Sequence, residues 1–199
     1  METDMTNLPF RHLKTSSKLV LALLMASIGC FATSPYVYGQ KDVRAVLIGK
    51  AARKPAPMFH LVGANGKTTQ ITDYHGKVIL LNFWATKCGG CILEIPSFID
   101  LHQKYQKSGF TAVGISADIP YEGLKSPDEA WQLVRPFMVS HKLNYPILMG
   151  NDSVIDAYGF QSYPATYLID RSGNIAATYV GVVAKDDVEA NIKALLAEH

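Results

Sequence analysis

The stretch WATKCGGCILEIP, residues 84–96, decides the fold of this 199-residue chain. It places Cys88 and Cys91 with two residues between them, directly after an apolar run and directly before a segment with helical spacing. Such a pair of thiols can hold a metal ion, close a structural disulfide or exchange disulfides with another molecule. The choice among the three depends on the other ligands in the chain, on the cellular compartment and on the backbone at Cys88.

The segments around this stretch alternate between strand and helix patterns. The run VILLNFWA, residues 78–85, is apolar in the way expected of a strand buried on both faces. Asn65 and Gly66 lie between two short strand patterns within residues 58–72 and predict a tight hairpin. Helical spacing continues from Cys88 towards Gly109. The elements expected after it are strands at 110–117, 145–150, 165–170 and 175–181, and helices near 130–141, at 152–160 and at 185–198.

This order predicts how the strands pair. Strands separated by helices imply parallel pairing, whereas the last two strands, joined by the short turn RSGN, imply an antiparallel pair. The fold class is therefore α/β, with a central mixed sheet flanked by helices.

The overall composition excludes some classes of partner. The chain is 48% hydrophobic and 18% charged, which is ordinary for a globular protein. Its formal net charge is +2, and no basic stripe is present. We therefore expect no binding of nucleic acid, and the charge gives no reason to expect binding to anionic lipid.

The N-terminus has the pattern of an export signal. Arg11, Lys14 and Lys18 precede the apolar residues 19–31, and small and polar residues follow. The apolar run is shorter than the roughly 20 residues of a membrane-spanning helix. Cleavage after Gly39 is the first expectation, and the alternatives are a retained membrane anchor or a lipid attached to Cys30. Residues 1–39 are thus assigned to export and residues 40–57 to a linker, and the protein is expected in the periplasm or another extracytoplasmic space.

The metal and structural interpretations of the cysteine pair are weak. A closed zinc site needs four ligands. Only Cys88 and Cys91 are left once Cys30 is assigned to the export segment, and the six histidines are scattered along the chain. A disulfide across so short a loop removes little entropy from the unfolded chain. A C-x-x-C motif beside a β-α-β pattern is instead typical of thiol–disulfide exchange. We therefore expect a redox-active Cys88–Cys91 pair with no metal and no bound organic cofactor.

The position of the pair assigns the two thiols different roles. At the first turn of a helix, free backbone N–H groups and the positive end of the helix dipole stabilise a thiolate, and the thiol pKa falls from about 8.5 to roughly 3.5–7.5. Cys88, at the tip, is the expected nucleophile. Cys91, one turn further in, is expected to resolve the mixed disulfide. Gly89 and Gly90 allow a close approach to the sulfur atoms.

Three stretches together resemble a known family. VILLNFWATKCGGCILEIP, the later YPATYLIDRSGNI and the earlier APMFHLVGANGKTTQITDYHGK are similar to the exported TlpA and ResA thioredoxin-like proteins, over about residues 55–199. The resemblance implies a thioredoxin fold in residues 58–199, with an N-terminal β-hairpin extension and a helical insertion after the second core strand. It also implies that the Tyr163–Pro164 bond is cis and that Pro164 faces the cysteine pair.

The same resemblance implies further site residues. Glu94 matches a glutamate that relatives hold near the active thiols, where it would relay the proton of Cys91; the alternative is a solvated glutamate in the first helical turn. Lys87 stands where many relatives have Trp, and the dipeptide between the cysteines is Gly89–Gly90 and not one that contains Pro. These positions influence the redox potential. Tyr163 and Trp84 complete the candidates for substrate contact, although Trp84 is more readily explained as core packing.

The expected function is that of an exported thiol–disulfide oxidoreductase acting as a monomer on protein disulfides or thiols. A reductive role, with a membrane thiol carrier as electron donor and cytochrome c maturation as one setting, is the preferred direction. A peroxiredoxin-like peroxidase is an alternative, but Ala85 and Leu81 occupy places where that pattern has Thr or Ser and Pro. A copper chaperone on the same fold is the non-enzymatic alternative; such carriers space their cysteines by three residues.

Overall fold

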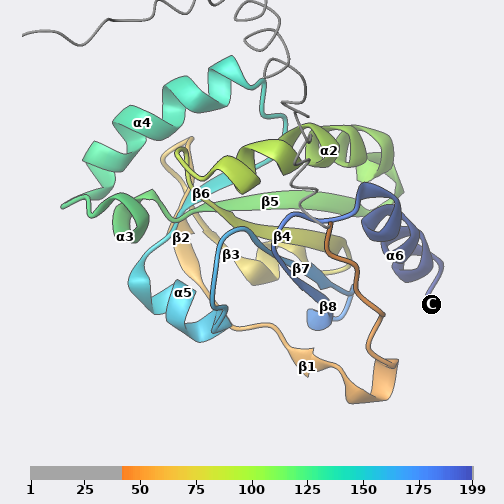
Figure 1. Cartoon of the computed structure of the whole chain (residues 1–199). Helices are drawn as coiled ribbons and strands as arrows, with labels where there is room; N and C mark the ends of the chain where they lie inside the picture. Colours follow the sequence, from red (N-terminus) through yellow and green to blue (C-terminus); the bar gives the residue numbers. More distant parts are fainter. Residues whose placement is uncertain (1–41, 199) are drawn as a thin grey trace, which may run out of the picture. The chain divides into compact units, whose positions relative to one another are not determined.

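Strand β4 (Val78–Trp84) lies inside the sheet between β7 and β5, and all seven of its residues are buried. The structure is a computed structural model and describes residues 42–198. In it, six strands form one sheet in the order β1-β8-β7-β4-β5-β6 (Figure 1). The strands of this sheet are β1 (Lys54–Pro55), β4, β5 (Phe110–Ser116), β6 (Ile147–Met149), β7 (Ala165–Ile169) and β8 (Asn174–Val180).

The sheet is mixed, as the order of elements predicted. β4 runs parallel to β5, and β5 runs parallel to β6. On its other side β4 is antiparallel to β7, which is in turn antiparallel to β8. The register pairs Trp84 with Ser116 and Phe83 with Ala165. The end of β4, the end of β5 and the start of β7 therefore meet at one edge of the sheet.

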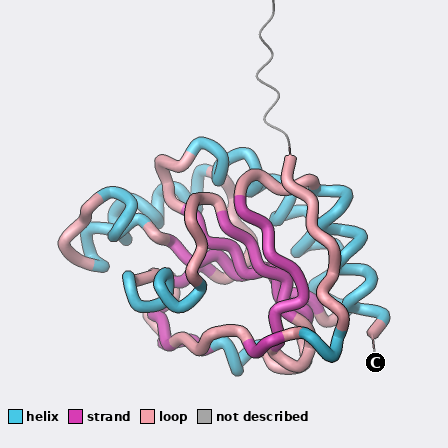
Figure 2. Tube along the Cα trace, turned by 60° about the horizontal axis from the view of Figure 1, so that its bottom comes forward, coloured by secondary structure: helices cyan, strands magenta, loops and turns pink. Residues whose placement is uncertain are grey.

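Helices cover both faces of the sheet, and Figure 2 shows the strands side by side between them. Alternate residues of β4 point to opposite faces. Leu80 and Trp84 pack with apolar residues of α2, α4 and α6, whereas Leu81 and Phe83 pack with α5 and the N-terminal hairpin. The helices are α2 (Gly89–Tyr105), α3 (Asp118–Glu122), α4 (Pro127–Ser140), α5 (Asp152–Tyr158) and α6 (Lys185–Ala197), with short 3-10 segments η1 (Lys50–Ala52), η2 (Ile71–Tyr74) and η3 (Gln106–Ser108).

The predicted hairpin and insertion are both confirmed. β2 (His60–Val62) and β3 (Thr68–Gln70) pair as an antiparallel hairpin. Its turn contains Gly66 at φ +78°, a backbone angle that glycine adopts without strain. A bridge from Gly63 to Leu148 joins the hairpin to the edge strand β6. Helices α3 and α4 form the insertion between β5 and β6, and α3 occupies part of the stretch that the sequence left irregular.

The described part of the expected linker differs from that expectation. Residues 42–57 lie against the domain and include β1, which pairs with β8 (Figure 1). The buried guanidinium of Arg53 lies 3.1 Å from the Asp170 carboxylate and 2.6 Å from that of Glu198. This segment is therefore part of the folded domain and not a free tether, because its backbone and its buried cation have partners there.

The expectations for the export segment lie outside the described residues. These expectations are the assignment of residues 1–39 to export, cleavage after Gly39, and the alternatives of a retained membrane anchor or a lipid attached to Cys30. Within residues 42–198, no helix is long and apolar enough to span a bilayer.

Candidate active site

Cys88 and Cys91 lie at the amino end of α2, where the chain leaves β4. Cys88 is the N-cap residue, with extended backbone angles, and its sulfur accepts a hydrogen bond from the Cys91 N–H over 3.2 Å. The two sulfur atoms are joined in a disulfide. A helix of 17 residues thus begins at the cysteine pair, and its first-turn N–H groups provide the positive end that favours a thiolate at Cys88.

Both cysteine residues are largely shielded from solvent. Cys88 is 4% exposed and Cys91 is 1% exposed, whereas Gly89 is exposed between them. A Cβ at Gly89 would meet no atom within 4 Å, so open space lies beside the tip of the helix. A partner can therefore reach Cys88 over the glycine, while Cys91 stays behind the first turn.

Glu94 lies one turn beyond Cys91 and is buried, with only 2% of its surface exposed. Its Oε1 accepts the backbone N–H of Val183 over 2.8 Å, and its Oε2 lies 3.4 Å from the amide of Asn82. That amide also donates to Thr166 over 2.9 Å. Burial raises the pKa of Glu94 to about 8, against the lowering effect of its two hydrogen bonds. The alternative of a solvated glutamate is wrong, because α2 turns this side chain towards the sheet and not towards solvent.

The Tyr163–Pro164 peptide bond is cis, as the resemblance implied. Pro164 is buried immediately before β7, at the sheet edge where β4 ends, so it lies at the same end of the molecule as Cys88. Its carbonyl accepts the N–H of Gly181 over 2.8 Å. Tyr163 is half-buried, with its ring 5.4 Å from that of Tyr121 in α3, and burial raises its pKa to about 12.

Lys87 and Trp84 differ in their access to a substrate. Lys87 is exposed and forms an ion pair with Glu122 of the insertion, which raises the lysine pKa. Trp84 is 1% exposed and packs against Phe137, with ring centroids 5.0 Å apart. The expectation of a substrate contact at Trp84 is wrong, because α4 covers its ring; the core-packing interpretation is correct.

A buried polar cluster beside the cysteines escaped the sequence analysis. Asp118, at the start of α3, accepts the Thr86 N–H over 2.9 Å, the Thr86 hydroxyl over 2.5 Å and the Ser116 hydroxyl over 2.8 Å. These contacts fix the turn between β4 and α2. The expected strand order could have indicated this cluster. Because β4 and β5 were expected to be parallel neighbours, polar residues that follow each strand should meet at one edge of the sheet.

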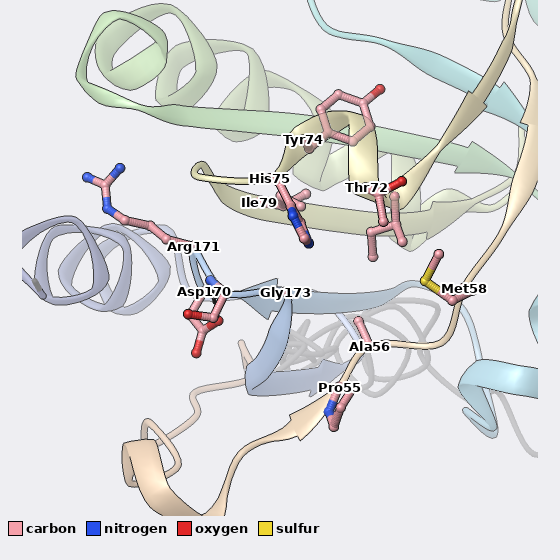
Figure 3. Close-up of a pocket in the computed structure, with 12 residues that line it drawn as sticks. Pro55, Ala56, Met58, Thr72, Tyr74, His75, Ile79, Asp170, Arg171 and Gly173 are labelled. Carbon is pink, nitrogen blue, oxygen red and sulfur yellow. Dashed lines mark hydrogen bonds between the residues drawn. The ribbon is translucent and has the colours of Figure 1, made fainter.

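The pocket in Figure 3 lies at the opposite end of the sheet from the cysteine pair. It has a volume of about 130 Å³ and is lined by residues that include Ile79 at the start of β4 and Asp170 at the end of β7. The Asp170 carboxylate is already bonded to the N–H groups of Ser172 and Asn174. The cysteine chemistry therefore does not involve this cavity.

Comparisons with known proteins agree with this geometry. The AhpC/TSA family matches residues 52–178. The chain belongs to this family. It is 31% identical to the thioredoxin-like protein YneN of Bacillus subtilis, over 85% of this chain and 93% of that one. It is 29% identical to the thiol-disulfide oxidoreductase ResA of Geobacillus thermodenitrificans, over 89% of this chain and 92% of that one.

Comparison with a solved structure identifies the fold. The crystal structure of a thiol:disulfide interchange protein of the thioredoxin family from Chlorobium tepidum is 29% identical, with a TM-score of 0.63 over 75% of this chain and all of that one. This AhpC/TSA-family chain therefore has a thioredoxin fold and is a thiol–disulfide oxidoreductase of the ResA type.

Proposed function

We propose that this oxidoreductase reduces disulfides in exported proteins through a Cys88–Cys91 dithiol cycle. The observation that carries the proposal is the cysteine pair at the amino end of α2, with Cys88 as its N-cap and a buried carboxyl group one turn beyond Cys91. In the proposed cycle the two cysteine sulfur atoms carry the electrons, so the cycle as we propose it uses no organic cofactor and no metal.

The reduced enzyme begins the cycle with Cys88 as a thiolate. Cys88 attacks one sulfur of a substrate disulfide, which forms a mixed disulfide and releases the other substrate sulfur as a thiolate. Cys91 then loses its proton and attacks the Cys88 sulfur, which frees the second substrate thiolate and closes the Cys88–Cys91 disulfide. Two electrons pass from the enzyme to the substrate, and a thiol donor returns them.

Glu94 is the proposed proton relay for Cys91. A carboxyl group with a pKa of about 8 is present in both protonation states near neutral pH, which is the range where a general acid or base works best. The carboxylate can take the proton of Cys91 during resolution. The carboxylic acid can return a proton to Cys91 when an external thiol attacks Cys88 of the disulfide.

The surface around Cys88 supports contact with a protein chain. Lys87, Gly89, Gly90 and Tyr163 lie around the helix tip and the cis-proline turn, and we assign them to substrate contact. We also assign to substrate contact the backbone of the cis turn at Pro164, which lies at the same end of the sheet as the cysteine pair. Substrate recognition is thus spread over several short segments at one edge of the sheet.

The compartment and partners follow from the export pattern at residues 11–39. We propose an extracytoplasmic protein that acts as a monomer, receives electrons from a membrane thiol carrier and has apocytochrome c among its substrates. Outside the cytosol, oxidising conditions form disulfides that a dedicated reductant must open.

Mixed-disulfide trapping tests this proposal. In the Cys91→Ser variant the first step occurs and resolution does not, so disulfide-linked substrate should accumulate; insulin is the first probe and an apocytochrome c is the second. The Cys88→Ser variant should trap no substrate, and Cys30→Ser is the matched control that leaves insulin reduction unchanged. Trapping by Cys88→Ser and not by Cys91→Ser would reverse the assigned roles.

Peroxide reduction is a second candidate because the matched family is named AhpC/TSA. The distinguishing measurement is the rate at which the reduced protein consumes hydrogen peroxide, compared with its rate of insulin reduction. We expect the disulfide reaction to dominate, since Ala85 and Leu81 replace the residues of the peroxiredoxin pattern. Titration of the reduced protein with Cu(I) under anaerobic conditions tests the copper-chaperone alternative.

A further inference from the structure

Residues 43–48 form an extended segment, here called the strap, that follows the edge of the domain beside α6 (Figure 1). Its side chains alternate in exposure along the segment. Val43, Ala45 and Leu47 are half-buried and pack against the core, whereas the residues between them are exposed. This is the burial pattern of an edge strand, although the strap has few partners on the sheet itself.

The strap pairs with residues 182–184, which follow β8. The Val43 N–H donates to the Val182 carbonyl over 2.7 Å, and the Ala184 N–H donates to the Val43 carbonyl over 2.9 Å. Val43 and Val183 thus form a parallel bridge. Gly181, at φ +110°, makes room for this contact, because a Cβ there would lie only 3.0 Å from Val43 Cγ2.

The same short segment holds Glu94 from its other side. Between the two groups bonded to Val43, the Val183 N–H points inward and donates to Glu94 Oε1 over 2.8 Å. Val182, Val183 and Ala184 are all buried. One stretch of three residues therefore has the strap as its outer partner and the buried carboxyl group as its inner partner.

A second anchor fixes the strap near the start of α6. The Ala45 N–H donates to Asp187 Oδ2 over 3.1 Å, and the Asn191 amide donates to the Ala45 carbonyl over 2.8 Å. The Arg44–Asp186 ion pair beside it is exposed and therefore adds little. The backbone of the strap, more than its charges, holds it in place.

We infer that the strap is a positioning element for Glu94: by holding residues 182–184 in place, it aims the Val183 N–H at the carboxyl group and keeps water away from it. The inference rests on the proposed proton-relay role of Glu94. It couples the segment that follows the expected export signal to the thiol chemistry, so a displaced strap changes how readily Cys91 exchanges its proton.

Loosening the strap has two opposite effects on Glu94. Loss of the Val183 hydrogen bond raises the carboxyl pKa, whereas entry of water lowers it. Desolvation is the largest cause of the present shift, and water would also replace the lost donor, so we expect a net fall. The groups that interact with Glu94 are the Asn82 amide, the Val183 N–H and the Tyr145 phenol, and Cys91 lies one turn earlier on the same helix; burial and the Glu94 charge raise the pKa of that phenol.

The test compares two proline variants in the full chain. Val43→Pro removes the N–H that bonds to Val182. Val46→Pro is the matched control, because Val46 is 91% exposed and its N–H has no hydrogen-bond acceptor within residues 42–198. The side-chain carboxyl of Glu94 is followed by ¹³C NMR against pH in the oxidised protein, where neither cysteine titrates, and is assigned with Glu94→Gln.

The inference predicts that Val43→Pro lowers the midpoint of the Glu94 titration by about one pH unit or more, while Val46→Pro leaves it in place. An unmoved midpoint in a folded Val43→Pro protein would overturn the inference. If Val43→Pro does not fold, Asn191→Ala, which removes the donor to the Ala45 carbonyl, must shift the midpoint in the same direction.

Kinetics separate this inference from the proposed function. The pH profile for resolution of the mixed disulfide should follow the NMR midpoint in each variant. A moved NMR midpoint with an unchanged kinetic profile would support the strap and contradict the relay role of Glu94. An unmoved NMR midpoint would contradict the strap whatever the kinetics show.

Discussion

Asp118 accepts two hydrogen bonds from Thr86, one from its backbone N–H over 2.9 Å and one from its hydroxyl over 2.5 Å. Asp118 is fully buried at the start of α3, just after β5 ends, and Thr86 is two residues before Cys88. The carboxylate therefore ties the turn that presents the nucleophile to the neighbouring strand.

Replacing Asp118 by Ala should lower the free energy of unfolding by about 1–3 kcal/mol, because the Thr86 N–H and the Ser116 hydroxyl lose their acceptor in a buried place. Urea unfolding of the oxidised protein measures this change. Asp118→Asn keeps the shape and one acceptor oxygen, so its loss should be smaller. Equal stability of Asp118→Ala and the parent protein would show that the cluster does not hold the turn.

Glu94 should make the stability of the oxidised protein depend on pH in an unusual direction. Its folded pKa of about 8 lies above the ordinary carboxyl value of 4.5, so between these values the folded state binds more protons than the unfolded state. The contribution is fully present below pH 4.5 and is lost as the pH rises to about 8. The free energy of unfolding should change through Glu94 by at most about 1.4 kcal/mol per pH unit.

The measurement is urea unfolding of the parent and Glu94→Gln proteins at several pH values between 5 and 8. Only the difference between the two proteins is interpreted, because other carboxylates, such as the half-buried Glu189, whose pKa its lysine partner lowers, act on both proteins alike. The stability advantage of Glu94→Gln should grow as the pH rises. A constant difference would mean that Glu94 ionises in the folded protein as freely as in the unfolded chain.

The two thiols should differ in reactivity towards iodoacetamide. In Cys91→Ser, the remaining Cys88 lies at the helix tip and should react about tenfold or more faster at pH 6 than a free thiol. In Cys88→Ser, the remaining Cys91 is shielded by the first turn of α2 and should react slowly. Rates measured against pH for both variants check this order, and a faster Cys91 at pH 6 would contradict the assigned roles.

The redox potential should lie on the reducing side, below about −200 mV. The range between a reducing thioredoxin and a strong oxidant is about 150 mV, or roughly 7 kcal/mol for a two-electron couple. The helix tip favours the Cys88 thiolate and moves the potential upward, but the Lys87 charge adds little because it is exposed and paired with Glu122. Equilibration with glutathione or dithiothreitol buffers gives the value, and a potential near −120 mV would make the protein a disulfide donor.

Gly114 should not tolerate a larger residue. A Cβ at this position of β5 would lie 2.7 Å from Ile147 Cδ1 and 2.8 Å from Trp84 Nε1. Gly114→Ala should therefore cost about 1–3 kcal/mol of stability through overpacking. Thermal unfolding measures the loss, with Gly89→Ala as the control, because a Cβ there meets open space. An unchanged midpoint for Gly114→Ala would show that the Trp84 ring can move aside.

The sequence predicted those features that depend on short-range patterns. The apolar run became the fully buried β4, the Asn65–Gly66 pair became a hairpin turn, and helix α2 begins at Gly89, directly after its N-cap Cys88. The mixed sheet followed from the spacing of strands and helices. Each of these signals lies within a window of a few residues.

Long-range contacts explain what the sequence left open. The burial of Glu94 depends on Val183, which is 89 residues away, so helix position alone could not separate a relay from a solvated side chain. The strap carried no alternating signal in the sequence, because residues 43–48 are apolar except for Arg44. Its alternation in burial arises only from pairing with residues 182–184, which are about 140 residues away in the chain.

The ion pair of Lys87 with Glu122 and the ring contact of Tyr121 with Tyr163 make α3 a neighbour of both loops that carry the chemistry. The insertion of α3 and α4 enters and leaves the sheet between β5 and β6, so its length and sequence can change without altering the order or register of the strands. Exchanging residues 119–126 between relatives, which keeps Asp118 and helix α4 in place, is therefore a route to redirect this enzyme towards other proteins while the support of its cysteine pair stays intact.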